Sequence, residues 1–314
     1  MTIKPLFFRF LALFVERKTA TRWIILFFLL FSIGLFSRFS LNKEGVQRPK
    51  IYDCFLFFNE LELLTIRLNE MDEGVDYFVL VEAAETFRGT PKSLYFSENR
   101  QLFEQFKEKI IHVVVDEHFE TGDPWLRERY QREQIFRGLK GCQSGDIILL
   151  SDVDEIVRKE NIKEIVEVVA AHKVEAVVCG QSMYCGYLNR YQGEWSGTVC
   201  TTFKEFKRMS TKLTRRLRNL YPHTLKKAHL TKVVRLPAQG WHFSSMGGID
   251  RYITKIESFS HAELDNPEAK KRERFRAMVS QFPLVEIDAT FPKYVQDNRA
   301  YFEQIGFLDL ATIN

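Results

Sequence analysis

Short apolar runs alternate with amphipathic stretches along the chain from residue 50 onward. The apolar runs predict strands, and the stretches between them, with leucines and other apolar residues at helical spacing, predict helices. The predicted strands are 51–58, 77–81, 110–115, 147–150, 174–178 and 232–236, and the predicted helices are 60–71, 99–109, 124–140, 162–171 and 265–280. Repeated strand–helix units predict an α/β fold with a mainly parallel, Rossmann-type sheet covered by helices on both faces.

The first fifty residues follow a different pattern. Residues 23–37 form an uncharged apolar run between Arg22 and Arg38. Fifteen helical residues span only about 22 Å, but the flanking arginines can snorkel to the headgroups of a bilayer. No A-x-A-like cleavage site follows the run, so it favours an uncleaved anchor over a signal peptide. We expect a basic segment at 1–22, a transmembrane or signal-anchor helix at 23–37, a linker at 38–49 and one folded domain at 50–314.

Charges around this run leave the orientation of the membrane anchor open. Five lysines and arginines precede it and four follow it, which leans only slightly toward a cytoplasmic N-terminus. No asparagine heads an N-x-S/T sequon, which fits a cytosolic domain without requiring one. The expected location is a membrane with a single-pass N-terminal anchor, with the domain either lumenal in a Golgi-type compartment or on the cytosolic face of a bacterial inner membrane.

Composition and motifs exclude several classes of function. The net charge is +4, and no basic run interleaved with aromatic residues indicates nucleic-acid binding. The basic stretch 204–232 is typical of a solvated face, and it could also meet an anionic membrane surface or a sugar diphosphate. The five cysteines form no C-x-x-C pair, which makes a zinc site improbable. The chain has no G-x-G-x-x-G after its first strand, no phosphate-binding P-loop and no G-x-S-x-G elbow.

The sequence IILLSDVDEI at 147–156 carries the main candidate chemistry. A buried strand is followed at once by Asp152, Asp154 and Glu155. In an open α/β sheet, ligands bind outside the carboxyl ends of the strands. Two carboxylates at positions i and i+2 of a strand-end turn can reach one hard divalent cation, directly or through water. The alternative is a solvated turn or an N-cap before the next helix.

Polar residues also follow the other predicted strands. Asn59 and Glu60 follow the first strand, Glu82 the second and Asp116 the third, which together with Asp152 suggests one polar rim. The aromatic, glycine-rich stretch 184–195 resembles sugar-binding loops in composition, although ordinary packing explains such clusters equally well.

His242 is a further candidate, and it lies in the sequence GWHFSSMGG. A single histidine is more often a hydrogen-bonded structural residue. Here it lies between two aromatic residues and close to a flexible glycine pair, where it could act as a third ligand to a bound metal–diphosphate.

Several stretches read together resemble glycosyltransferase family 17. They are 52–60 with 66–70, 79–83 with 86–89, 125–132, 145–156, and 240–248 with 261–263, in this order along the chain. The resemblance covers roughly residues 50–265 and leaves out the N-terminal segment and the C-terminal tail. It implies a GT-A-like fold, a UDP-GlcNAc donor, a divalent metal such as Mn²⁺, and inversion at the anomeric carbon.

The resemblance also implies roles for particular residues. Asp152 and Asp154 would belong to the D-x-D site for metal and diphosphate, with His242 as the late metal ligand. The residues expected to line the nucleotide pocket are Asn59, Glu60 and Glu82. The two arginines of the helix before the D-x-D motif, Arg127 and Arg132, would reach the leaving diphosphate or brace the acids.

On this reading the protein is a membrane-anchored glycosyltransferase that moves GlcNAc from UDP-GlcNAc to a hydroxyl of a glycan or glycoprotein. An inverting displacement also needs a carboxylate base. The candidates are Asp250, Glu263, Glu194 and Glu155, the last of which could instead cap the next helix. The short anchor and the missing sequons leave open a bacterial polysaccharide or a lipid-linked sugar as acceptor. A two-metal phosphoesterase and a carbohydrate-binding protein with a degenerate site are the rival classes.

Overall fold

A computed structural model describes residues 48–170, 174–219, 221–227 and 229–311. The chain from Pro49 onward forms one compact unit. The predicted anchor at 23–37 lies outside the described residues. Within them, no helix has both the length and the apolar character that a membrane crossing requires.

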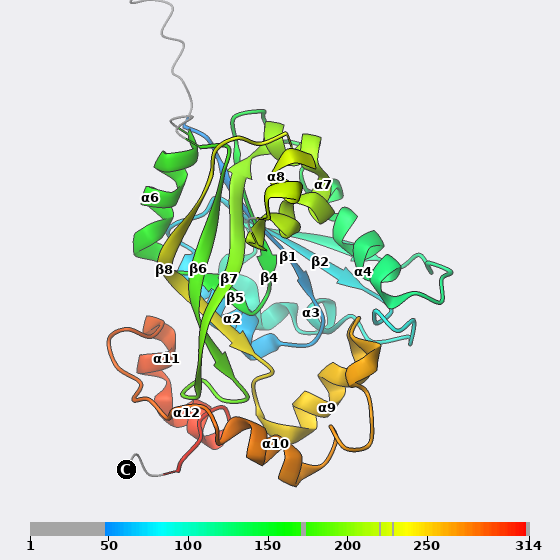
Figure 1. Cartoon of the computed structure of the whole chain (residues 1–314), viewed down its shortest axis with the longest axis vertical. Coiled ribbons are helices and arrows are strands. Elements are labelled where there is room, and N and C mark those ends of the chain that lie inside the picture. The colour runs from blue at the N-terminus through cyan, green and yellow to red at the C-terminus, as the bar shows by residue number, and fades with distance from the viewer. Residues whose placement is uncertain (1–47, 171–173, 220, 228, 312–314) are drawn as a thin grey trace, which may run out of the picture. The chain divides into compact units, whose positions relative to one another are not determined.

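Eight strands of the described chain form one sheet in the order β3-β2-β1-β4-β7-β6-β8-β5 (Figure 1). The strands are β1 Ile51–Phe57, β2 Tyr77–Ala83, β3 Ile110–Val115, β4 Ile147–Asp152, β5 Glu155–Val157, β6 Ala176–Cys185, β7 Tyr191–Thr202 and β8 Val233–Ser244. The pairs β3–β2, β2–β1, β1–β4 and β6–β8 are parallel, and the other three pairs are antiparallel. The predicted α/β class with a mainly parallel sheet is therefore confirmed.

Helices connect these strands and also follow the last of them, β8. They are α2 Leu61–Met71, α3 Tyr95–Glu98, α4 Pro124–Glu133, α5 Ile135–Gly138, α6 Lys159–Ala170, α7 Phe203–Arg216, α8 Pro222–Lys227, α9 Gly248–Ser258, α10 Arg272–Val279, α11 Lys293–Asp297 and α12 Arg299–Gln304, with 3₁₀ turns η1 Arg100–Phe106, η2 Leu217–Asn219 and η3 Ala262–Leu264. Helices α2 and α6 cover one face, and α4, α5 and α7 cover the other.

The core follows from the alternation of side chains along the strands. Successive residues of a strand point to opposite faces, so Phe55 of β1 packs in the cluster with α2, while Cys54 packs in the cluster with α5 and α7. Both side chains are fully buried. Strands buried on both faces read as continuous apolar runs, which is why the sequence pattern located them.

The order in which successive strands are added to the sheet reverses at β1. Strands β2 and β3 lie on one side of β1, and β4 lies on the other. Leu56 of β1 pairs with Asp152 at the carboxyl end of β4. A crevice at such a reversal is where open α/β sheets bind ligands, and it places the residues after β1 next to the D-x-D turn.

The second half of the sheet was not fully predicted. The stretch 184–195 was expected to be an aromatic loop, but it contains the end of β6, a turn and the start of β7. Glycines at 193 and 197 weaken the strand signal, because glycine has low β propensity. Gly240 of β8 is required for a different reason: a Cβ there would lie 2.0 Å from the carbonyl oxygen of Ile156 in β5.

Three helix predictions need correction. The helix predicted at 99–109 is a 3₁₀ segment, η1, and the helix predicted at 124–140 is divided into α4 and α5 at Gln134. The helix predicted at 265–280 begins only at Arg272. Pro267 accounts for the loss of the first predicted residues, because the residue before a proline is disfavoured in helical conformation.

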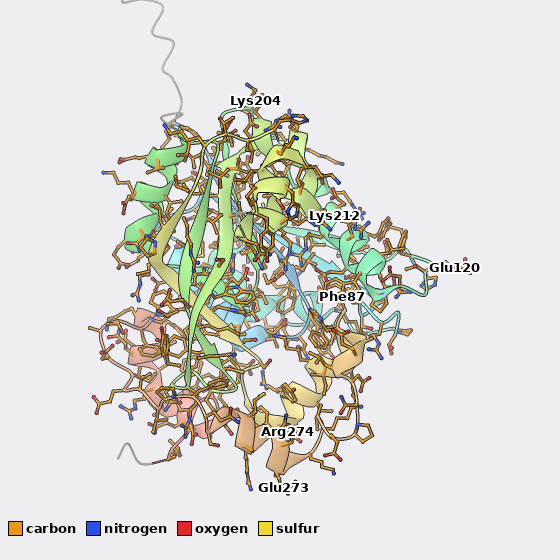
Figure 2. The ribbon with its side chains drawn as sticks, in the orientation of Figure 1. Phe87, Glu120, Lys204, Lys212, Glu273 and Arg274 are labelled. Carbon is orange, nitrogen blue, oxygen red and sulfur yellow. The ribbon has the colours of Figure 1, made fainter. Side chains whose placement is uncertain are left out.

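The basic stretch 204–232 is split between solvent and the interior. Lys204 and Lys212 of α7 are exposed (Figure 2), whereas Arg218 is buried. Part of this stretch is thus a solvated face, and part of it reaches the site described next.

Candidate active site

A pocket of about 350 Å³ lies at the carboxyl ends of β1 and β4. It is lined by residues after β1, the D-x-D turn, α4, the end of α7, β8 and the segment after α9. The charged residues in its wall are Glu60, Glu85, Lys92, Glu128, Arg132, Asp152, Asp154, Glu155, Arg215, Arg218 and Lys255. Segments far apart in the sequence therefore bring their charges to one place.

A buried arginine holds the backbone of the D-x-D turn in place. Arg67 of α2 is fully buried and forms a two-point ion pair with Asp53 of β1, with N–O distances of 2.7 and 2.5 Å. Its Nη1 donates to the carbonyl oxygens of Asp152 at 2.9 Å, Val153 at 3.2 Å and Glu155 at 2.9 Å. The turn is therefore held by charge-assisted hydrogen bonds to its backbone.

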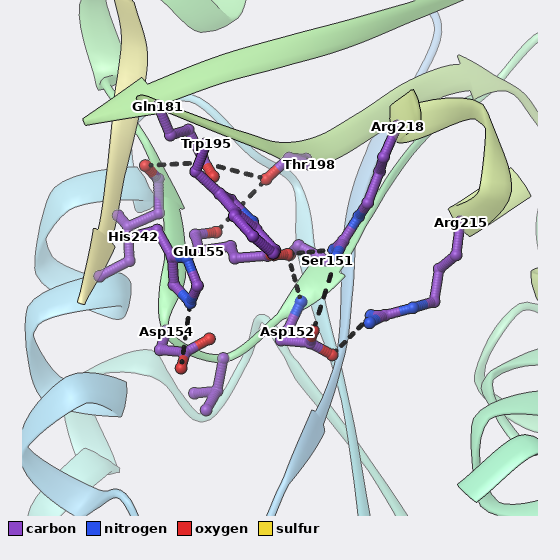
Figure 3. A network of polar contacts seen from close by, with 12 residues as sticks. Ser151, Asp152, Asp154, Glu155, Gln181, Trp195, Thr198, Arg215, Arg218 and His242 are labelled. Atoms are coloured by element: carbon purple, nitrogen blue, oxygen red, sulfur yellow. Dashed lines mark hydrogen bonds and ion pairs between the residues drawn. The ribbon is translucent and has the colours of Figure 1, made fainter. Parts of the chain in front are cut away.

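The carboxylate of Asp152 points toward three arginines. Its Oδ1 accepts from Arg215 at 2.6 Å, and its Oδ2 lies 3.8 Å from Arg218 (Figure 3). Its Oδ1 also accepts from Arg132 at 2.9 Å. Burial alone would raise the pKa of Asp152, but the three guanidinium groups outweigh it and hold that pKa well below its usual range. Arg132 thus braces an acid, one of the two roles proposed for it from the sequence.

Asp154 faces the opposite side of the pocket. Its Oδ2 lies 3.5 Å from Nε2 of His242 (Figure 3). The same oxygen accepts from Lys255 of α9 at 3.2 Å. Burial would raise the pKa of Asp154, but Lys255 and His242 lower it overall. The other ring nitrogen of His242, Nδ1, is buried and forms no hydrogen bond within the described residues.

Glu155 closes the turn and has a structural set of partners. Its Oε2 accepts from the backbone N–H of Asp152 at 2.9 Å and from Arg218, and its Oε1 accepts from the indole of Trp195 at 2.8 Å. The side chain is fully buried. Glu155 begins β5 rather than capping α6, and with both oxygens occupied it is poorly placed to take a proton.

Asn59 and Glu60 follow β1 and lie close to the pocket. Glu60 lines the main pocket, and both residues line a small adjoining cavity with Asp154 and Lys255. Glu60 Oε2 accepts from the backbone N–H groups of Phe58 and Asn59. Burial raises the pKa of Glu60, and nearby Lys255 offsets this only in part.

Glu82, predicted to line the pocket, and Arg127, predicted to reach the diphosphate or brace the acids, both lie outside the pocket lining. Glu82 is fully buried and accepts from the backbone N–H groups of Phe96 and Ser97 and from His112, so it anchors α3 rather than lining the pocket. Arg127 pairs with Glu85 and donates to carbonyl oxygens of the neighbouring loops, among them Phe87. It supports the pocket wall from behind.

Three of the candidate bases also lie outside the pocket. The carboxylate of Asp250 is 87% exposed on α9, and that of Glu263 is 65% exposed and bonded to His261. Glu194 is exposed on β7, where it accepts from Tyr191. The sequence could not show which way these three carboxylates point, because their directions depend on how α9 and the β6–β7 hairpin pack.

The three predicted metal ligands are not assembled as a three-ligand site. Across the described ranges, no group of three or more His, Cys, Asp or Glu side chains is arranged to hold a metal ion. Asp152 is turned toward its arginines. Asp154 Oδ2 and His242 Nε2 lie 3.5 Å apart and form a pair that one cation could contact. The other nitrogen of His242, Nδ1, is buried away from the pair.

Several pocket residues were not singled out from the sequence. Glu128, Lys255, Glu85 and Lys92 all line it, together with Arg215 and Arg218 from the basic stretch. Glu128 lies one turn before Arg132 on α4, so both side chains are on one face of the helix. This spacing could have indicated Glu128 as a pocket residue. Lys255 offered no local signal.

Aromatic residues form parts of the pocket wall. The ring centroids of Trp195 and His242 are 4.9 Å apart. Trp125, whose side chain is partly exposed, lies edge-on to His261 with ring centroids 4.6 Å apart. Aromatic faces pack well against the C–H surfaces of sugars.

The charged pocket lies at the strand-order reversal of the sheet, which is where open α/β sheets bind ligands. The family model described as glycosyltransferase family 17 matches residues 38–281, which is more than half of the chain. The protein therefore belongs to glycosyltransferase family 17, and the resemblance found in its sequence motifs is confirmed.

Similarity to characterised members is local. Beta-1,4-mannosyl-glycoprotein 4-beta-N-acetylglucosaminyltransferase of Homo sapiens is 30% identical over 113 residues, which cover 33% of this chain and 21% of the human protein. The Rattus norvegicus enzyme of the same name is also 30% identical over 113 residues, with the same coverage. The chain thus spans about a fifth of the length of the curated relatives it matches.

Solved structures with detectable similarity are distant. A mannosyltransferase, PcManGT of Pyrobaculum calidifontis in complex with GDP-Man and Mn²⁺, gives a TM-score of 0.43 at 13% identity, covering 74% of this chain and 70% of that one. S. aureus TarS 1–349 in complex with UDP-GlcNAc gives a TM-score of 0.40 at 10% identity, covering 74% and 71%.

Proposed function

We propose that the protein transfers GlcNAc from UDP-GlcNAc to a glycan hydroxyl, with inversion, in a GT-A-like domain. The observation that carries the proposal is the pocket at the ends of β1 and β4, where the D-x-D acids, three arginines and Lys255 converge. Membership of glycosyltransferase family 17 and the local similarity to an N-acetylglucosaminyltransferase support the choice of donor.

The residues of the pocket stabilise a leaving diphosphate through charge. Arg215 and Lys255 enter from opposite sides of the D-x-D turn and are both partly exposed to the pocket. Positive groups fixed in a partly buried site stabilise negative charge that develops on UDP as the glycosidic bond breaks. Asp152 holds Arg132 and Arg215 in position for this role.

The charge of the pocket wall favours a divalent cation entering with the donor. Six carboxylates and five cationic side chains line it, so the wall is not positive before a diphosphate binds. Asp154 and His242 would hold such an ion together with diphosphate oxygens, and when bound it acts as a Lewis acid toward the leaving group. Mn²⁺ is the metal we propose, and Asp152 supports the site through its arginines.

The acceptor we propose is a sugar hydroxyl of a glycoprotein glycan, or of a bacterial polysaccharide or lipid-linked sugar. Family membership does not decide between these, because an acceptor is selected by the mouth of the pocket rather than by the fold.

We also propose that residues 23–37 tether the domain to a membrane. Extraction of membranes carrying the full-length chain with alkaline carbonate tests this. Retention of the protein in the membrane pellet is the expected result, and complete release into the supernatant would exclude a spanning anchor.

A UDP-release screen of the full-length protein tests the proposed activity. Individual UDP-sugars are incubated with the protein, with and without Mn²⁺, and the UDP formed is measured. We expect release from UDP-GlcNAc above the other sugars, and its loss when EDTA removes the metal. UDP release from none of the sugars under any metal condition would contradict the transferase proposal.

A further inference from the structure

We propose that Glu128 is the general base that accepts the proton of the acceptor hydroxyl. This assignment rests on the proposed transferase function, and it names the acceptor end of the same pocket. None of the four carboxylates suggested by the sequence meets the requirements of a base, because three lie outside the pocket and Glu155 is fully bonded.

The two oxygens of Glu128 have different partners. Oε1 accepts from Arg132 at 3.0 Å, which fixes the carboxylate on α4. Oε2 accepts a hydrogen bond from the hydroxyl of Ser260, on the segment that follows α9. One oxygen is thus held in place by a cation, and the other already binds an O–H group at the pocket.

The other carboxylates of the pocket wall have different partners. Among the six described acids that line it, only Glu128 accepts a hydrogen bond from a hydroxyl group through its carboxylate. Asp152 and Asp154 are bonded to cationic side chains, and Glu60 accepts from two backbone N–H groups. Glu85 is bonded to Arg127, to His118 and to the backbone N–H of Phe119.

Charge keeps Glu128 in the form that a base requires. Burial acts to raise the pKa of its carboxyl, but Arg132 and Arg215 lower it overall. The side chain is 14% exposed, so it is shielded from bulk water and still reachable from the pocket. An ionised carboxylate that can contact an incoming hydroxyl meets the geometric condition for general-base catalysis.

The surroundings of Glu128 suit a saccharide. Trp125, three residues earlier, lies edge-on to His261, and both residues line the pocket beside Ser260. A sugar that stacks on Trp125 would bring a hydroxyl to Oε2 in place of the Ser260 hydroxyl. The acceptor class is therefore a saccharide with a free hydroxyl group.

In the reaction, the acceptor oxygen forms a bond to the anomeric carbon of GlcNAc as the bond from that carbon to the β-phosphate oxygen breaks. The proton of the acceptor hydroxyl passes to Oε2 of Glu128. UDP leaves with the electron pair of the broken bond, and attack from the opposite side inverts the anomeric carbon. Water in place of the sugar gives hydrolysis by the same steps.

Glu128→Gln in the full-length protein tests this assignment with UDP-GlcNAc and water as the reactants. The amide keeps the shape of the side chain but cannot accept the proton, so kcat for UDP release falls by about 100-fold or more while KM for UDP-GlcNAc stays close to that of wild type. The loss of activity of the wild type at acid pH, which reports protonation of Glu128, is absent from the residual activity of the variant.

Glu263→Gln is the matched control, because its carboxylate lies on the same segment as Ser260 but outside the pocket. It leaves kcat unchanged. A Glu128→Gln protein with wild-type kcat, or one whose defect lies in KM alone, overturns the base assignment. Absence of UDP release from the wild type overturns the transferase proposal itself, so the two failures are distinguished.

Discussion

Asp154→Asn is expected to reduce UDP release from UDP-GlcNAc by about 100-fold or more while the domain stays folded. Asp154 is where Lys255 and His242 converge on the pocket, and its pKa is lowered so that the carboxylate is charged. The amide removes that charge with almost no change in shape. Steady-state UDP release by the purified variant, with a thermal melt to confirm folding, measures the effect.

The control for this variant is Asp250→Asn. Its carboxylate lies on α9, the helix that carries Lys255, but it is 87% exposed and outside the pocket. We expect wild-type UDP release from this protein. Wild-type activity in Asp154→Asn would remove Asp154 from the site.

Arg67→Met is expected to destabilise the domain by about 3–5 kcal/mol, because removing one partner of a buried ion pair leaves the other charge uncompensated. Asp53 is fully buried, and burial already raises the pKa of its carboxyl despite the presence of Arg67. The variant also leaves the carbonyl oxygens of the D-x-D turn without their donor. Urea unfolding of wild type and variant measures the difference in the free energy of unfolding.

A double variant separates the unpaired charge from the lost packing. Arg67→Met combined with Asp53→Val removes both charges, so we expect it to be more stable than Arg67→Met alone. Stability of the single variant equal to that of wild type would show that Arg67 does not hold the turn.

The sequence predicted the first half of the sheet well, for a physical reason. Strands β1, β2 and β4 are buried on both faces and β3 is partly buried, so all four appear as largely apolar runs. Asp152 and Asp154 follow the fourth of these runs, and the ends of parallel strands share one edge of the sheet. The position of the candidate site could therefore be predicted from the sequence.

Long-range packing decided what could not be predicted. Glu82 follows the second predicted strand just as Glu60 follows the first, yet Glu82 lies within β2 and is bonded to the start of α3, whereas Glu60 faces the pocket. Lys255 reaches Asp154 from 101 residues away. The residues next to Glu82 and Lys255 in the sequence do not indicate these partners.

The role of Arg67 in the interior of the domain could not be predicted from the sequence either. This residue lies on a helix whose leucines predict an apolar face, and an arginine there suggests solvent exposure. In the structure it is fully buried, because Asp53 and the carbonyl groups of the turn satisfy its donors. Only the three-dimensional arrangement shows that this residue supports the D-x-D turn.

The central claim is that the pocket at the ends of β1 and β4 binds the donor diphosphate. A crystal structure of the protein with UDP-GlcNAc and Mn²⁺ tests it most directly. We predict density for the diphosphate between Arg215 and Lys255, beside Asp154. Diphosphate density at another place on the protein would contradict the account.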